Sequence, residues 1–290
     1  MANNQFSQYL LNRGVLSADN AGRVLAKSIS VAPELAVIAL ERGLIDAQHA
    51  EKLLGVQDFM AETLEDNYLT ALQLDELKKS MPSPRARLGQ VLLNEGLADL
   101  QLLARLFEES KEACCQPVDE VVDAMLERQG ADLKEHAHIR EYVQLFVRAM
   151  SKLAHTDVIL VMDEDVDLVD ATYLIYQSMG GALRLTAGCR MTRAVLLAMA
   201  RRFSGEGLPE LNDMAFDCIE EFCNVVNGLY IVNMSSHSKD MDLEMPKTIE
   251  NGVPAGDGVF SLMVETEFGA FMLYLSRDGF VLNERNYFGW

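Results

Sequence analysis

Residues 213 to 232 predict a long helix, one face of which could do chemistry. Two carboxylates, a carboxamide and a glycine follow one another at steps of four, three and four residues: Asp217, Glu221, Asn224 and Gly228. Side chains at these steps lie above one another on an α-helix, so the four residues form one narrow face, which we call the polar ridge. A surface helix often directs polar residues outward, so the pattern is equally typical of a solvated face.

Gly228 and its neighbour Asn227 make the polar ridge more specific. Both residues lie in the middle of the predicted helix, where together they cost about 1 to 2 kcal/mol relative to alanine. The sequence shows no packing gain that would offset this cost. A glycine on an exposed ridge leaves room for the backbone of another molecule to approach closely. We therefore interpret the polar ridge as a contact surface.

The remaining residues of this helix are expected to position the polar ridge. Asn212 is the predicted N-cap, and Asp213 near the first turn complements the helix dipole. The opposite face is expected to be an apolar stripe that packs on a core, made of Met214, Cys218, Ile219, Phe222, Val225, Val226 and Leu229.

The polar ridge resembles the signature of the CheC, CheX and FliY family of chemotaxis phosphatases. That signature is an Asp or Ser, three residues, Glu, two residues, Asn, and a proline further along the chain. Asp217, Glu221 and Asn224 match it, and Pro246 stands 22 positions after Asn224, close to the spacing of the family. Gly228 matches the family's NxxxG continuation.

The resemblance extends from about residue 133 to residue 285 and points to the CheX branch of the family. CheC and FliY have two signature helices, whereas CheX has one. In this chain the earlier helix has Glu141 but no Asn three residues later, so only one signature helix is present. Since CheX proteins typically act as dimers, the resemblance also implies a homodimer.

The resemblance implies hydrolysis of the aspartyl phosphate on a CheY-like response regulator. Asn224 would orient the attacking water, and Glu221 would engage the lysine of the receiver's active site. Asp217, Gly228 and Pro246 would support the docking of this partner. Magnesium would belong to the receiver, so no cofactor of the chain's own is expected. The alternative is a non-catalytic signalling adaptor that binds a receiver or another partner, under the control of a ligand of the N-terminal region.

Residues 1–110 predict short helices separated by a recurring turn. A phrase of apolar pairs around a small residue appears four times, with turn residues Gly14, Gly43, Asn67 and Gly96. These residues suit helix ends in a left-handed conformation. The interval from Gly14 to Gly43 equals the interval from Asn67 to Gly96. This regularity predicts two tandem helical repeat units that arose by duplication.

The fourth copy, at residues 87–97, resembles the RLGxxLxxxG motif of the N-terminal domains of MshE-type and GspE-type ATPases. Some members of that family bind cyclic di-GMP through paired motifs. Only this copy begins with RLG, while the region from Gln8 to Gly14 lacks the arginine. A packing module without a nucleotide is therefore favoured over a cyclic di-GMP site, for which Arg87 would be the residue to test.

The order of predicted elements indicates a multi-domain protein, with an α-helical repeat domain at residues 1–130 and an α+β, CheX-like domain at residues 131–290. The second domain is expected to begin with a helix at about 136–154 that buries Ile139, Val143, Phe146, Val147 and Met150. Strands at 157–163, 171–179 and 182–189 follow, with a hairpin turn at Gly180 and Gly181. Strands and helices come in groups rather than alternating, which is typical of the α+β class.

Composition excludes several partners. The chain has 44 Asp and Glu against 25 Lys and Arg, a net charge of −19, so no nucleic-acid partner is expected. No apolar run approaches the roughly 18 residues needed to span a bilayer, and a cytoplasmic location without membrane insertion is expected. The histidines and cysteines form no metal-ligand pattern. The acidic run from Asp163 to Asp167 lacks the glycine and glutamate of a calcium loop and is expected to be a turn.

Overall fold

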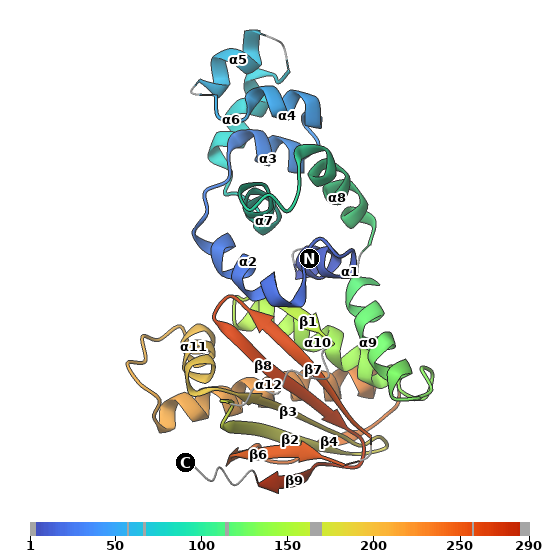
Figure 1. Cartoon of the computed structure of the whole chain (residues 1–290). Coiled ribbons are helices and arrows are strands. Elements are labelled where there is room, and N and C mark those ends of the chain that lie inside the picture. Colours follow the sequence, from blue (N-terminus) through green and yellow to red (C-terminus); the bar gives the residue numbers. More distant parts are fainter. Residues whose placement is uncertain are drawn as a thin grey trace. The chain divides into compact units, whose positions relative to one another are not determined.

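A computed structural model of the chain describes residues 4–56, 58–65, 68–113, 116–162, 170–256 and 258–284. It divides into two compact units, Met1–Pro117 and Val118–Trp290, shown in Figure 1. Asn67, the acidic run from Asp163 to Asp167 and the cysteine pair at 114–115 lie outside the described residues.

The first unit is helical throughout its described secondary structure. Its helices are, in chain order, α1 (Asn4–Asn12), α2 (Ala18–Ser30), α3 (Leu35–Glu41), α4 (Ala47–Leu53), α5 (Phe59–Glu65), α6 (Ala71–Lys79), α7 (Pro84–Asn94) and α8 (Leu100–Glu112). The turns expected at Gly14, Gly43 and Gly96 are confirmed, with φ of 70°, 70° and 67°, values that a glycine adopts without strain. Three residues after each of these glycines, an N-cap residue begins the next helix.

Helices α1 and α7 share a further detail. Nε2 of Gln8 donates to Oδ1 of Asn12 inside α1, and Nε2 of Gln90 donates to Oδ1 of Asn94 inside α7. Both N···O distances are 3.0 Å. Both pairs stand at the same distance before the turn glycine that follows, Gly14 or Gly96. This agreement supports an internal repeat, while the duplication into two tandem units remains a prediction.

The second unit is built around an antiparallel sheet. Its helices are α9 (Gln116–Arg128), α10 (Ala137–Leu153), α11 (Arg193–Ser204) and α12 (Asp213–Ser236). Its strands are β1 (Ile159–Val161), β2 (Tyr173–Gly181), β3 (Leu185–Met191), β4 (Met241–Leu243), β5 (Lys247–Glu250), β6 (Gly252–Ala255), β7 (Val259–Thr266), β8 (Gly269–Ser276) and β9 (Val281–Glu284). The main sheet has the order β1-β7-β8-β3-β2-β4, with β5 also paired to β2, and β6 pairs with β9.

Figure 1 shows α10 and α12 behind the sheet, and their apolar sides form its core. The five apolar residues expected to be buried on α10 are all buried there, which confirms that prediction. A helical region followed by an α+β region with an antiparallel sheet and long helices confirms the expected fold class.

The division between the units lies at the start of α9 rather than near residue 130. Val118, Val122 and Leu126 of α9 are at most 1% exposed and belong to the core of the second unit. Arg140 and Gln144 of α10 hydrogen-bond to carboxylates of α9 as well. The expected boundary at 130/131 followed the polar segment RQGAD at 128–132, but the burial of α9 places this helix with the second unit.

The hairpin turn expected at Gly180 and Gly181 lies two residues further on. Strand β2 continues through Gly181, and residues 182–184 connect it to β3. Gly181 pairs with Met241 of β4, and a Cβ atom there would lie 2.5 Å from the carbonyl oxygen of Asp240. The glycine is therefore needed for the close approach of two strands rather than for the turn.

At one end of the sheet, Asp157 lies in an acidic environment. The neighbouring Glu267 carboxylate accepts a hydrogen bond from Thr156 and pairs with Arg202 at 2.9 Å. Burial, with the charge of Glu267, raises the pKa of Asp157 to about 6 from 3.8. Ionisation of Asp157 therefore opposes folding above about pH 6, and this penalty disappears as the pH falls below about 4.

Replacement of Asp157 with asparagine is expected to raise the free energy of unfolding by about 2 kcal/mol at pH 8. The reason is that the variant has no buried charge to form near Glu267. At pH 4 the gain should disappear, because the native carboxyl is then protonated. Urea denaturation of Asp157→Asn and of the unchanged protein at both pH values measures this. A gain of equal size at pH 4 and pH 8 would contradict the role of ionisation.

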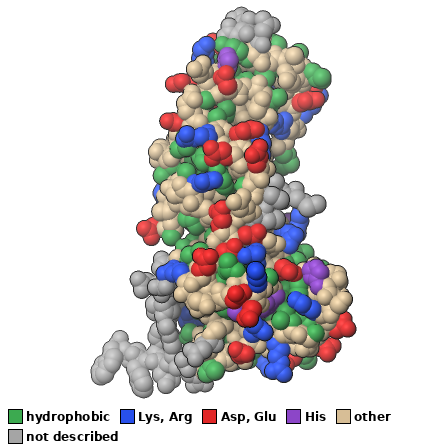
Figure 2. All heavy atoms as spheres, turned by 90° about the vertical axis from the view of Figure 1, so that its right-hand side faces the viewer, with side chains coloured by type: hydrophobic (Ala, Val, Ile, Leu, Met, Phe, Trp, Pro, Cys, Tyr) green, Lys and Arg blue, Asp and Glu red, His purple; other side chains and the backbone are tan. Residues whose placement is uncertain are grey.

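Among the described residues, no helix is long and apolar enough to cross a membrane. On the face that Figure 2 presents, acidic and basic side chains are interspersed. Cys189 and Cys223 are buried free thiols, and Cys218 is a half-buried free thiol.

Candidate functional site

Helix α12 begins as predicted. The side chain of Asn212 accepts a hydrogen bond from the backbone N–H of Ala215 at 3.1 Å and so caps the first turn. The helix then packs against β2, α10 and α11. This packing leaves one long side of α12 facing outward.

The structure places the polar ridge on that outward side. Asp217 and Glu221 are exposed, and Asn224 and Gly228 are half-buried. A Cβ atom added to Gly228 would meet no atom within 4 Å. Packing inside the protein therefore does not require a glycine at this position.

The apolar stripe expected on the opposite face is partly wrong. Ile219, Phe222 and Val226 are buried as expected. Met214 and Leu229 are 54% and 46% exposed instead. The buried face of α12 also contains five residues that were not part of the expected stripe: Ala215, Cys223, Asn227, Tyr230 and Met234.

Asn227 has a packing role that the sequence did not reveal. Its side chain is 1% exposed and hydrogen-bonded on both sides. Its Oδ1 accepts from the hydroxyl of Tyr142 on α10 at 2.8 Å, and its Nδ2 donates to Oε1 of Gln177 on β2 at 2.8 Å. These bonds tie helix, helix and sheet together and offset the helix-propensity cost of an asparagine at this position.

Gln177 connects this buried cluster to the polar ridge. Its side chain is fully buried, and its Nε2 donates to Oδ1 of Asn224 at 3.1 Å and to the carbonyl oxygen of Glu244 at 2.7 Å. Nδ2 of Asn224 in turn donates to Oε2 of Glu221 at 3.3 Å. An unbroken chain of hydrogen bonds thus runs from Tyr142 in the core to Glu221 on the surface.

Sequence reasoning missed Gln177 as a functional residue. A polar residue in the strand segment YLIYQSM is typical of a solvent-facing position. The alternation of side chains along the strand could have revealed it. Ile175, Gln177 and Met179 point to the same face of the sheet, and the two apolar residues are buried there.

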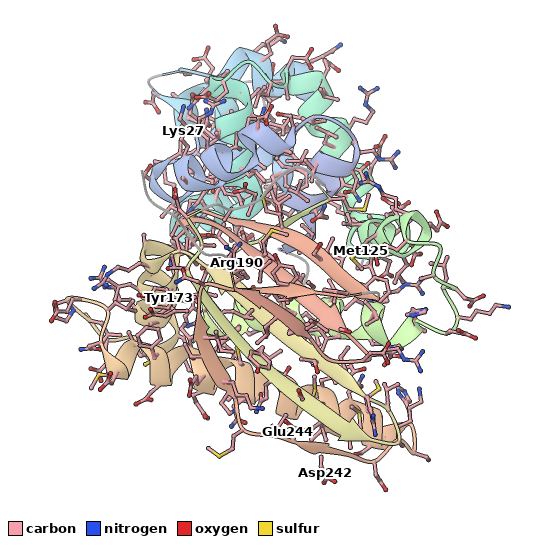
Figure 3. The ribbon with its side chains drawn as sticks, turned by 60° about the horizontal axis from the view of Figure 1, so that its bottom comes forward. Lys27, Met125, Tyr173, Arg190, Asp242 and Glu244 are labelled. Carbon is pink, nitrogen blue, oxygen red and sulfur yellow. The ribbon has the colours of Figure 1, made fainter. Side chains whose placement is uncertain are left out.

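Pro246 lies between β4 and β5, two residues after Glu244. Proline fixes its own φ and restricts the residue before it, so this connection is rigid. Figure 3 shows Glu244 and Asp242 at the edge of the sheet. A second bond, from the hydroxyl of Thr248 on β5 to Glu220 on α12 at 2.6 Å, holds the same connection against the helix.

Exposed apolar side chains flank the polar ridge. Leu229 and Val232 are 46% and 69% exposed on α12. They line a groove of about 450 Å³ together with Leu145, Arg148, Asn233 and Ser236. Polar groups for chemistry and apolar groups for contact are thus available on one side of the same helix.

Two further expectations concern ligands. Among the described residues, no group of three or more His, Cys, Asp or Glu side chains could hold a metal ion. Arg87 lies in α7 and is half-buried; its role in binding cyclic di-GMP remains a prediction.

Comparison with known proteins gives structural matches only. No protein-family model and no curated protein matches the chain. The chemotaxis protein CheX from Desulfovibrio desulfuricans is 14% identical with a TM-score of 0.40, over 51% of this chain and 99% of that chain. CheX from Vibrio vulnificus is 14% identical with a TM-score of 0.42, over 48% and 98%. The CheX–CheY–BeF3–Mg complex from Borrelia burgdorferi matches at 13% identity and a TM-score of 0.41, over 48% and 96%.

Proposed function

We propose that the second unit removes the phosphoryl group from the aspartate of a phosphorylated receiver domain. The observation that carries this proposal is the environment of the Asn224 side chain. Its carboxamide is held from behind by the buried Gln177, lies beside the carboxylate of Glu221, and stands on an exposed ridge. A carboxamide fixed at a protein surface is suited to act on a group that a partner presents.

The reaction requires little covalent chemistry from this chain. An acyl phosphate is already reactive, so the main requirement is a water molecule in line with the phosphorus and the leaving carboxylate. The water oxygen bonds to phosphorus while the bond from phosphorus to the aspartyl oxygen breaks, which yields inorganic phosphate and a free carboxylate. Asn224 would hold this water, since a neutral carboxamide both donates and accepts hydrogen bonds. The magnesium ion of this reaction is assigned to the receiver.

Glu221 and Gly228 would serve the contact with the receiver. The Glu221 carboxylate, one turn before Asn224, would pair with a lysine of the receiver's active site, and Asp217 would extend the acidic side of the contact. The open space around Gly228 would admit the receiver's backbone. The exposed side chains of Leu229 and Val232 would add apolar contact area.

The direct test mixes the protein with each phosphorylated receiver domain from its own genome and follows the loss of phosphate. We expect faster dephosphorylation of at least one receiver, and slower catalysis with Glu221→Ala than with the unchanged protein. Equal decay of every receiver with and without the protein would reject the enzymatic function. Binding without faster decay would instead support the non-catalytic adaptor, for which the exposed Leu229 and Val232 also provide contact area.

Gly228→Ala separates stability from binding. Because the added methyl group meets no atom within 4 Å, the variant should unfold at a free energy about 0.5 to 1 kcal/mol higher. The same methyl group should weaken receiver binding several-fold. Ser235→Ala, an exposed position on the same helix, is the matched control. Thermal denaturation and receiver titration measure the two effects, and unchanged affinity in Gly228→Ala would show that no partner approaches there.

A further inference from the structure

We propose that Gln177 is a positioning residue that determines which end of the Asn224 carboxamide faces a docked receiver. This inference rests on the proposed function for its catalytic consequence. The orientation itself is a property of the free protein. It follows from three buried side chains, those of Tyr142, Asn227 and Gln177, and the backbone carbonyl of Glu244, whose donors and acceptors match in only one arrangement.

The orientation of Gln177 is fixed by two neighbours. The carbonyl oxygen of Glu244 can only accept a hydrogen bond, so the atom of Gln177 that contacts it at 2.7 Å is Nε2. Oε1 of Gln177 then faces Asn227, whose Nδ2 donates to it at 2.8 Å. The second N–H of Gln177 is left for Oδ1 of Asn224, at 3.1 Å.

Tyr142 completes the far end of the chain of hydrogen bonds. Since Oε1 of Gln177 can only accept, it binds Nδ2 of Asn227, and the hydroxyl of Tyr142 donates to the Oδ1 that remains, at 2.8 Å. Burial raises the pKa of Tyr142 well above its usual value, and the hydroxyl therefore keeps its proton at neutral pH. All members of the chain then have one consistent direction of donation.

The result at the surface is a defined orientation of Asn224. Its Oδ1 lies on the side of Gln177, and its Nδ2 lies on the side of Glu221, at 3.3 Å from Oε2. A flipped carboxamide, with Oδ1 and Nδ2 exchanged, would bring two N–H groups face to face and leave a buried donor of Gln177 without an acceptor. An unsatisfied buried group costs about 1 to 3 kcal/mol, a bias of about 5- to 150-fold against the flipped form.

Strand β2 and the segment before Pro246 thereby become part of the site. Gln177 is fully buried and does not reach the surface, so its effect on a receiver must pass through Asn224. The connection that contains Pro246 also contains Glu244, whose carbonyl oxygen accepts a hydrogen bond from Gln177. By holding this acceptor in place, the connection orients Gln177 and, through it, Asn224.

The test replaces Gln177 with methionine, which has a similar length but offers no N–H donor. Ile175→Val, also buried on β2, is the matched control. We expect dephosphorylation of the receiver to slow by up to about twofold, because without the Gln177 donor the two orientations of Asn224 become equally populated, and we expect receiver affinity to stay unchanged. In the free protein, the side-chain amide NMR signals of Asn224, assigned by their loss in Asn224→Ala, should shift in Gln177→Met and stay in place in Ile175→Val.

A second variant keeps the inference testable if Gln177→Met does not fold. Gln177→Glu retains the acceptor for Asn227 but cannot donate to Asn224 when ionised, and should shift the same Asn224 signals. Unshifted Asn224 signals in a folded variant would overturn the positioning role. If no receiver is dephosphorylated, the proposed function fails, and the NMR measurement still decides the orientation of Asn224.

Discussion

Replacing Asn224 with alanine is expected to lower the rate of receiver dephosphorylation by about 100-fold or more, with little change in receiver affinity. In the proposed mechanism the carboxamide acts on the attacking water rather than on the receiver surface, so its loss would remove an interaction made in the transition state. The structure supports this division of roles. Asn224 is half-buried and is bonded to Gln177 and Glu221, while Leu229 and Val232 remain exposed for contact.

Single-turnover dephosphorylation at saturating protein, beside a titration of receiver binding, measures the two quantities separately. Ser235→Ala is the control, because Ser235 is exposed on the same helix and is not among the residues that line the groove. It should leave both rate and affinity unchanged. If folded Asn224→Ala dephosphorylates the receiver as fast as the unchanged protein, Asn224 takes no part in the reaction.

Replacing Asn227 with leucine is expected to lower the free energy of unfolding by about 3 kcal/mol. The leucine has a similar volume, so the loss does not come from a cavity. It comes from the hydroxyl of Tyr142 and the Oε1 of Gln177, two buried groups that would lose their hydrogen-bond partner. Each such group costs about 1 to 3 kcal/mol.

Urea denaturation of the whole protein, followed by a signal from the second unit, measures this effect. Asn233→Leu provides the comparison for stability. It replaces the same residue type on the same helix, but Asn233 is exposed, so no buried group loses its partner. A loss below about 1 kcal/mol in Asn227→Leu would mean that water or another side chain replaces the missing partner.

Helices α10 and α12 of the second unit were predictable because their signals are local. The apolar spacing of α10, the N-cap at Asn212 and the steps of the polar ridge all lie within short segments. Periodicity and capping therefore indicated the helices and the ridge. They also indicated the three turn glycines of the first unit, Gly14, Gly43 and Gly96.

The features that were missed depend on partners far away in sequence. Asn227 was read as a cost, because its partners Tyr142 and Gln177 lie 85 and 50 residues away. Gly181 was read as a turn, because the strand that needs its small size, β4, comes much later in the chain. Helix α9 was assigned to the first domain, since only its burial shows which core it joins. No local pattern reports contacts of this kind.

The buried bonds behind Asn224 also bear on the thermodynamics of an encounter. A free asparagine side chain samples several rotamers, and fixing a side chain at an interface costs about 0.5 to 1.5 kcal/mol. In this chain the hydrogen bond from Gln177 restricts Asn224 before any partner arrives. That loss of conformational entropy occurs once, when the chain folds, and does not recur with each receiver.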